Sequence, residues 1–110
     1  MDKYEDVLVV QTSALGMDQR KPLILAALQG LFSPRAIVER NELASRKFEG
    51  LPDANGLLAG QLEGPVRIQL NGLQFEVDVL GGHKTGLYLD QQVNYRRIAE
   101  LPKGAQVLDC

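Results

Sequence analysis

Residues 66–79 read VRIQLNGLQFEVDV, and this stretch decides the most certain part of the fold. The pair Asn71-Gly72 stands between two runs of alternating apolar and polar residues, which is the strongest short-range signal for a β-hairpin. A two-residue turn pairs Leu70 with Leu73 and puts the apolar side chains of both runs on one face. The same register places an arginine opposite a glutamate on the exposed face, where such a pair adds about 0.2–1 kcal/mol.

Upstream of the hairpin the sequence predicts a strand–helix–strand unit. The continuous apolar run of residues 7–10 is typical of a buried central strand. Pro22 suits the first turn of a helix, which Ser33-Pro34 would end. The apolar residues that would share one face of this helix are Leu23, Ile24, Ala27, Leu28 and Leu31. Residues 36–39 form a second strand candidate, so the two strands are expected to be parallel.

Two polar residues are expected to begin helices in this first part. Asp18 would cap the helix that contains Pro22, and Asn41 would cap a short helix ending near Lys47. Residues 49–60 contain three glycines and a proline, and they predict a surface loop.

The C-terminal part predicts one helix and one strand. Asp90 is expected to cap a helix through about Leu101. The residues expected to turn inward from this helix are Tyr95, Ile98 and Ala99. Residues 106–110 resemble the first strand of a nucleotide-binding α/β unit, although an ordinary C-terminal strand is the alternative. A lone strand has an exposed edge, so residues 103–110 are expected to be disordered or to self-associate by pairing with another molecule.

Length, charge and cysteine content exclude several classes of protein for this chain. A chain of 110 residues with 45% hydrophobic content suits one small globular domain. The net charge of −2 argues against a dedicated nucleic-acid module, which would be basic, but allows one wall of a composite RNA site. The single cysteine, Cys110, offers neither a disulfide nor a zinc framework and fits a reducing cytoplasm. No apolar run approaches membrane-spanning length, so no membrane partner is expected.

Small and polar residues cluster after the hairpin, where an ordinary connection needs only one or two of them. Residues 82–91, GHKTGLYLDQ, with Asn94 and Arg96, resemble the signature of the large-subunit ribosomal RNA cytosine-5 methyltransferase I family. Members of this family are S-adenosylmethionine-dependent enzymes. Further stretches that match the family in the same order are 9–13, 49–51, 71–78 and 107–110. The resemblance therefore spans nearly the whole chain.

The resemblance implies an α+β fold class and a division of the chain. A PUA RNA-binding domain would precede Met1, and residues 1–80 would form the central α+β domain. Residues 81–110 would form a linker helix and the truncated first strand of a Rossmann-like methyltransferase domain. The chain would then be a fragment of a cytoplasmic rRNA-processing enzyme, inactive alone, that contributes one wall of the RNA and cofactor cleft. The alternative is a stand-alone interaction or RNA-binding module without catalysis.

The resemblance also implies a set of residues against bound S-adenosylmethionine. They are Lys84, Thr85, Gly86, Tyr88, Asp90, Gln91, Asn94 and Asp109. Gln92 departs from the family pattern, which commonly has a basic residue there, so a contact by that side chain is in doubt. Arg96 or Arg97 would be the substitute, one turn further along. The isolated chain is expected to bind the cofactor weakly or not at all.

No catalytic residue and no metal ligand is expected in the chain. The nucleophilic cysteine of the family belongs to a motif further downstream, so Cys110 is not its counterpart. His83, the only histidine, is expected to be a turn-exposed residue rather than a base. Six basic residues of the first half would form one side of an RNA cleft, or simply an ordinary solvated surface, which the net charge favours. They are Arg20, Lys21, Arg35, Arg40, Arg46 and Lys47.

Overall fold

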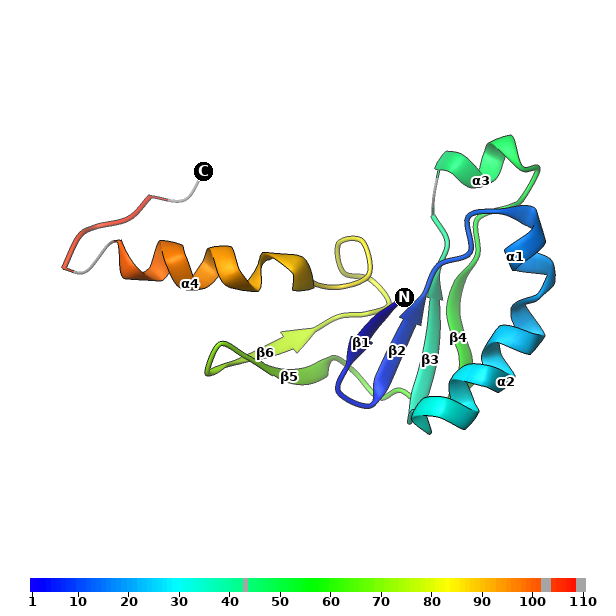
Figure 1. Cartoon of the computed structure of the whole chain (residues 1–110), viewed down its shortest axis with the longest axis horizontal. Helices are drawn as coiled ribbons and strands as arrows, with labels where there is room; N and C mark the ends of the chain where they lie inside the picture. Colours follow the sequence, from blue (N-terminus) through cyan, green and yellow to red (C-terminus); the bar gives the residue numbers. More distant parts are fainter. Residues whose placement is uncertain (43, 102–103, 109–110) are drawn as a thin grey trace.

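The computed structural model describes residues 1–42, 44–101 and 104–108, and its centre is a four-stranded sheet. The strands, in spatial order, are β1 (Asp2–Tyr4), β2 (Val7–Val10), β3 (Ala36–Arg40) and β4 (Asn55–Gly60). β2 and β3 are parallel, whereas β1 and β4 pair antiparallel with their neighbours. The parallel pair confirms the predicted strand–helix–strand unit, and the fold as a whole is α+β (Figure 1).

Two helices connect β2 to β3 and cover one face of the sheet (Figure 1). They are α1 (Leu15–Gln19) and α2 (Lys21–Phe32). The predicted apolar face of α2 is wrong in part, because Leu23 and Leu31 are 69% and 76% exposed while Leu25 and Leu28 contact the sheet. The amino group of Lys21 binds Glu39 of β3 at 2.7 Å, and this contact fixes the rotation of the helix. Residues four and seven positions after Lys21 then point at the sheet.

The two predicted helix caps are wrong. Asp18 lies inside α1, and α2 has Arg20 as its N-cap with no side-chain hydrogen bond. The side-chain oxygen of Asn41 instead accepts from the backbone amide of Thr12, at 2.8 Å, and the short helix α3 (Ala44–Phe48) begins three residues later. Both polar side chains bind distant partners, which compete with a local capping role.

The predicted loop over residues 49–60 is also wrong at its C-terminal end, because β4 occupies half of it. Gly56 and Gly60 have positive φ angles of 140° and 80°, and they allow an irregular edge strand beside β3. A Cβ atom on Gly60 would lie 1.9 Å from the carbonyl oxygen of Arg35. Gly60 therefore serves a close approach of the backbone rather than a turn, whereas Gly56 has open space around it and supplies only its unusual φ angle.

The predicted hairpin is confirmed residue for residue. Its strands are β5 (Val66–Leu70) and β6 (Leu73–Val77), and every expected pair is present. Both turn residues have positive φ angles, 52° for Asn71 and 82° for Gly72, as a type I′ turn requires. The expected ion pair between Arg67 and Glu76 is present on the surface at 3.0 Å.

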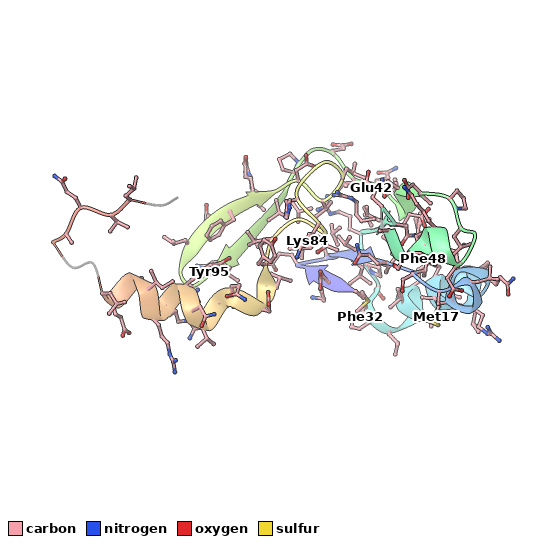
Figure 2. All side chains as sticks on the ribbon, turned by 90° about the horizontal axis from the view of Figure 1, so that it is seen from above. Met17, Phe32, Glu42, Phe48, Lys84 and Tyr95 are labelled. Atoms are coloured by element: carbon pink, nitrogen blue, oxygen red, sulfur yellow. The ribbon has the colours of Figure 1, made fainter. Side chains whose placement is uncertain are left out.

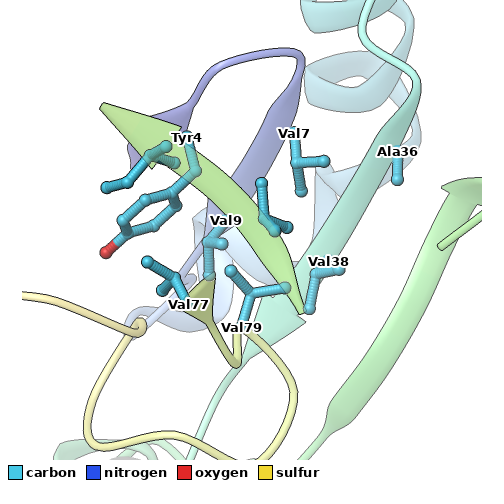
Figure 3. Close-up of a cluster of buried hydrophobic side chains, with 9 residues drawn as sticks. Tyr4, Val7, Val9, Ala36, Val38, Val77 and Val79 are labelled. Carbon is cyan, nitrogen blue, oxygen red and sulfur yellow. The ribbon is translucent and has the colours of Figure 1, made fainter. Parts of the chain in front are cut away.

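The hairpin packs on the sheet face opposite α2 and completes the larger core. This core contains Tyr4, Val7, Val9, Ala36, Val38, Val66, Ile68, Val77 and Val79 (Figure 3). Leu8 and Val10 of β2 point the other way, to α2. β2 is therefore buried on both faces, which explains its continuous apolar run.

After the hairpin the chain forms a short 3₁₀ helix, η1 (Leu89–Gln91), and then α4 (Gln92–Glu100), which lies beside the hairpin (Figure 1). Asp90 lies within η1 and caps nothing, because the N-cap of α4 is Gln91 with no side-chain bond. The predicted inward face is wrong for Ile98, which is 59% exposed, while Tyr95 and Ala99 line a shallow groove against the hairpin.

One residue of the hairpin turn ties α4 to the rest of the molecule. The side-chain amide of Asn71 donates to the carbonyl oxygen of Gln92 at 3.1 Å, and its oxygen accepts from Arg96 at 2.6 Å. Residues 104–108 form no strand, and positions 109 and 110 of the predicted strand lie outside the described residues. In the described ranges, no helix combines the length and the apolar character that crossing a membrane requires.

A matched pair of glycine substitutions tests the close approach at β4. Gly60→Ala should lower the free energy of unfolding by at least about 2 kcal/mol, because it adds a clash to a left-handed backbone. Gly30→Ala, in α2 with open space around the added methyl group, should raise it by about 0.5–1 kcal/mol. Urea unfolding measures both, and a Gly60→Ala protein as stable as the parent would contradict the placement of β4.

Candidate functional site

The loop that follows the hairpin begins with a tight turn built on Asp78. Its carboxylate accepts from the backbone amides of Leu80 and Gly81 at 3.0 and 2.8 Å, and its carbonyl oxygen accepts from the amide of Gly82 at 2.9 Å. A Cβ atom on Gly81 or Gly82 would lie 2.8 or 2.2 Å from atoms of Asp78. Gly82 is therefore required by the turn itself, because its neighbour is a backbone oxygen, whereas the neighbour of Gly81 is the end of the Asp78 side chain.

Two side chains of β1 hold the next part of the loop. The Tyr4 hydroxyl donates to the carbonyl oxygen of Leu87 at 3.0 Å and accepts from its amide at 2.9 Å. The Asp2 carboxylate accepts from the Thr85 hydroxyl at 2.6 Å. Thr85, one of the predicted site residues, is consequently buried against the sheet.

Arg40, at the end of β3, holds the start of the loop. Its guanidinium donates to the carbonyl oxygens of Val79 and Gly82 at 3.1 and 2.8 Å, and Glu42 is 3.5 Å away. The Arg40 side chain is only 6% exposed, and its Nε is buried with no hydrogen-bond partner. A buried cation with one unmatched donor is an expensive feature that a ligand or a water molecule would relieve.

Between this loop and the sheet lies a cleft of about 740 Å³, a size typical of small-molecule sites. The sheet side contributes Asp2, Gln11, Arg40 and Glu42. The loop and η1 contribute His83, Lys84, Thr85, Leu87, Tyr88, Leu89, Asp90 and Gln91. Lys84 lies at the middle of the molecule, between the half that contains Tyr95 and the half that contains Phe48 (Figure 2).

The structure brings five of the eight predicted site residues to this cleft: Lys84, Thr85, Tyr88, Asp90 and Gln91. Gly86 lies behind it, where a Cβ atom would be 2.6 Å from Val77. Asn94 reaches the cleft only indirectly, since its amide donates to Gln91 at 2.7 Å. Asp109 lies outside the described residues.

Three exposed side chains form a small cluster at the mouth of the cleft. The Lys84 ammonium lies 4.6 Å from the centre of the Tyr88 ring, a cation–π distance. The Tyr88 hydroxyl is 3.2 Å from Nδ1 of His83. His83 is exposed, as predicted, and Lys84 has a positive φ angle of 54°, which aims its side chain across the turn.

The charges of the cleft are mixed. Carboxylates of Asp2, Glu42 and Asp90 face the cations of Arg40 and Lys84. Such a lining suits a ligand that carries both charges rather than a simple anion. Over the described part of the chain, no group of three or more acidic, histidine or cysteine side chains could hold a metal ion.

Sequence reasoning missed the sheet side of the cleft and a polar network beside it. Arg46, predicted as a surface cation, is 1% exposed and donates to Asp18 at 2.8 Å, to the carbonyl oxygen of Pro52 at 3.0 Å and to Thr12. The expectation of a solvated or RNA-facing side chain is therefore wrong for Arg46, and also for Arg40. Their partners are distant in sequence, so no local pattern marks them.

Three of the other predicted basic residues are also engaged within the chain. Lys21 binds Asp18 and Glu39, Arg35 binds Asp6, and Arg20 donates to a backbone carbonyl of its own helix. These contacts engage five of the six basic residues, all except Lys47, with partners inside the chain instead of presenting them as one cationic face.

The network around Asp18 shifts two ionisation equilibria. Hydrogen bonds from Arg46 and then from Thr12 hold the pKa of the Asp18 carboxyl far below its usual range. Partial burial works against the charged form of Lys21, but hydrogen bonds to Glu39 and Asp18 outweigh it and raise the pKa of the Lys21 ammonium. Both shifts favour the charged forms that the network needs.

Removing the Asp18 charge should make stability less dependent on acidic pH. Because the pKa of Asp18 is lowered in the folded protein, its contribution is complete above the unfolded value of about 4 and is lost as the pH falls below it. Asp18→Asn should therefore cost about 3 kcal/mol at pH 7, since it leaves buried Arg46 without its counter-charge, and less at pH 3. Chemical denaturation at both pH values measures the difference.

The matched control is Asp6→Asn, which removes an exposed partner of Arg35. This control should cost less than about 1 kcal/mol, as surface ion pairs do. An Asp18→Asn penalty that is equal at pH 7 and pH 3 would show that the carboxylate charge is not what holds Arg46.

The chain is similar over its whole length to part of a set of longer proteins. It is 43% identical over 111 residues to the ribosomal RNA large subunit methyltransferase I of Shewanella denitrificans and 42% identical over 111 residues to that of Shewanella amazonensis. The protein of the same name from Photobacterium profundum is 38% identical over 112 residues. In each case the whole of this chain is covered but only 28% of the relative. No family model matches the chain.

Proposed function

We propose that the chain is a segment of a large-subunit ribosomal RNA methyltransferase and forms one wall of its cofactor and RNA cleft. The observation that carries this proposal is the cleft itself. Five residues that the family resemblance assigns to the cofactor come together there, from a chain that matches the methyltransferases along its whole length. The chain spans only about 28% of those relatives, so methyl transfer belongs to the complete protein.

S-adenosylmethionine is the cofactor that we propose for this cleft. It carries a carboxylate and two cationic groups, and the lining offers Lys84 and Arg40 to the former and Asp2, Glu42 and Asp90 to the latter. The buried unmatched Nε of Arg40 supports a site that is completed by a polar ligand. When bound, the cofactor supplies an electrophilic methyl group; the residues of this chain orient it and exclude water from one side.

The finer parts of the proposal rest on the family resemblance. They are cytosine-5 specificity, a cytoplasmic location, a PUA domain before the chain, and the division into residues 1–80 and 81–110. Gly86, Asn94 and Asp109 complete the proposed cofactor set, the first two as supports of Thr85 and Gln91. No residue of this chain is proposed to form a covalent bond to RNA.

The outer surface of α4 favours a segment of a larger protein over a stand-alone module. Ile98 and Leu101 are 59% and 82% exposed, and Val107 and Leu108 beyond them are 68% and 86% exposed. Exposed large apolar side chains often mark contacts with other protein, so these four favour a segment of a larger protein.

A chimera tests the proposed activity. This chain would replace the matching 28% of the Shewanella amazonensis relative, and transfer of labelled methyl groups from S-adenosylmethionine to large-subunit rRNA would be measured. Asp90→Asn should raise the KM for S-adenosylmethionine by about tenfold, the effect of losing one charged hydrogen bond. Asp53→Asn, an identical change on an exposed loop outside the cleft, should change it by less than about twofold. A chimera without methyl transfer, beside an active parent, would contradict the proposal.

The isolated chain should bind S-adenosylmethionine more weakly than micromolar, because it supplies only one wall of the site. Isothermal titration calorimetry on the 110-residue chain measures this directly. Micromolar affinity would mean that the cleft described here is a complete site.

A further inference from the structure

Tyr4 differs from the other residues near the cleft because its ring packs in the core while its hydroxyl binds the loop. The side chain is 1% exposed, and the ring packs among core valines such as Val9 and Val77 (Figure 3). The hydroxyl leaves this apolar cluster and reaches the loop. Tyr4 itself does not line the cleft.

The hydroxyl holds one peptide group on each side of a single residue. It donates to the carbonyl oxygen of Leu87 and accepts from the amide of Leu87, at 3.0 and 2.9 Å. A phenol can donate one hydrogen bond and accept others, so both bonds form together. The Tyr4 hydroxyl thus satisfies both backbone groups of Leu87, as a residue of a paired strand would.

A second contact, between two side chains, lies two residues away on both segments. Asp2 and Tyr4 are alternate residues of β1 and therefore lie on the same face of the strand. Their partners Thr85 and Leu87 are also two residues apart, with the Thr85 hydroxyl 2.6 Å from the Asp2 carboxylate. Two side-chain contacts therefore join β1 to the loop, Asp2 with Thr85 and Tyr4 with Leu87, and we call them the two rungs.

Gly86, between the two rungs, has no room to move toward the core. Its φ angle is 134°, and a Cβ atom there would lie 2.6 Å from Val77 and 3.3 Å from the Tyr4 hydroxyl. The rungs and this tight packing fix the directions of the residues on either side. Those residues include Lys84 and Tyr88, which face the cleft.

We propose that Tyr4 is a positioning residue for the cofactor cleft, acting through the backbone of Leu87. This inference rests on the proposed function. Tyr4 sets the placement of Thr85 and Tyr88 without touching the cofactor, so its hydroxyl governs cofactor affinity rather than the rate of the bound complex.

The substitution Tyr4→Phe tests this role, because it keeps the ring in the core and removes both hydrogen bonds to Leu87. In the chimera, the KM for S-adenosylmethionine should rise by roughly tenfold, as expected for two ordinary hydrogen bonds, while kcat changes by less than about twofold. In the 110-residue chain, hydrogen exchange of the Leu87 amide should accelerate by at least about tenfold. Tyr95→Phe, which removes a hydroxyl from an exposed ring on α4, should leave all three quantities unchanged.

The outcomes separate this inference from the function on which it rests. Unchanged exchange at Leu87, or a fall in kcat and melting temperature with an unchanged KM, would overturn the positioning role. Absence of methyl transfer in the unsubstituted chimera would overturn the proposed function, and with it the cofactor part of the inference. Faster exchange together with a raised KM supports both.

Discussion

The parallel pairing of β2 with β3 is the constraint on which the rest of the molecule depends. It requires a crossover, which α1 and α2 supply, and it leaves both faces of the pair to be covered. Leu8 and Val10 pack against α2 on one face, and Val7 and Val9 pack against the hairpin on the other. The pairing also brings the carboxyl ends of two strands together at one edge of the sheet. Ligands of α/β sheets commonly bind at that edge, and the cleft lies there.

The same edge holds a concentration of buried polar groups. Thr12, two residues after β2, is buried and its backbone amide donates to the side-chain oxygen of Asn41 at 2.8 Å, and Arg46 lies buried against Thr12. Two buried guanidinium groups cost desolvation energy, and each recovers it only through acceptors supplied by other elements. Such groups add little net folding free energy, but any other arrangement of the strand ends would leave a buried charge without its partner. The hydrogen bonds of Arg40 and Arg46 therefore fix the sheet side of the cleft, because they break if one partner moves.

The parts of the fold that the sequence predicted are those whose signals are local. The hairpin follows from Asn71-Gly72 and the alternation on each side, so its register could be derived pair by pair. The five loop residues that meet in the cleft lie within eight positions of one another, in the stretch that resembles the methyltransferase signature. The face of α2 could not be derived in the same way. Leucines lie on several sides of that helix, and the ones that contact the sheet, Leu25 and Leu28, are on the side where Lys21 reaches Glu39.

The burial of Arg40 and Arg46 could not be predicted from the sequence for a related reason. Nothing near either residue distinguishes it from Lys47 or Arg35, because the acceptors come from residues that only the folded chain brings near. The same holds for Tyr4, whose partner is 83 positions away. Bonds from Tyr4 to Leu87, from Thr85 to Asp2 and from Arg40 to Gly82 cross the proposed division at residue 80 and join the glycine-rich loop to the sheet. The bond from Asn71 to Gln92 also crosses it and joins the hairpin to α4. Side chains of β1 and β3 therefore attach the glycine-rich loop to the sheet. Both sides of the cleft are consequently held in place by these bonds, with the sheet on one side and the loop on the other.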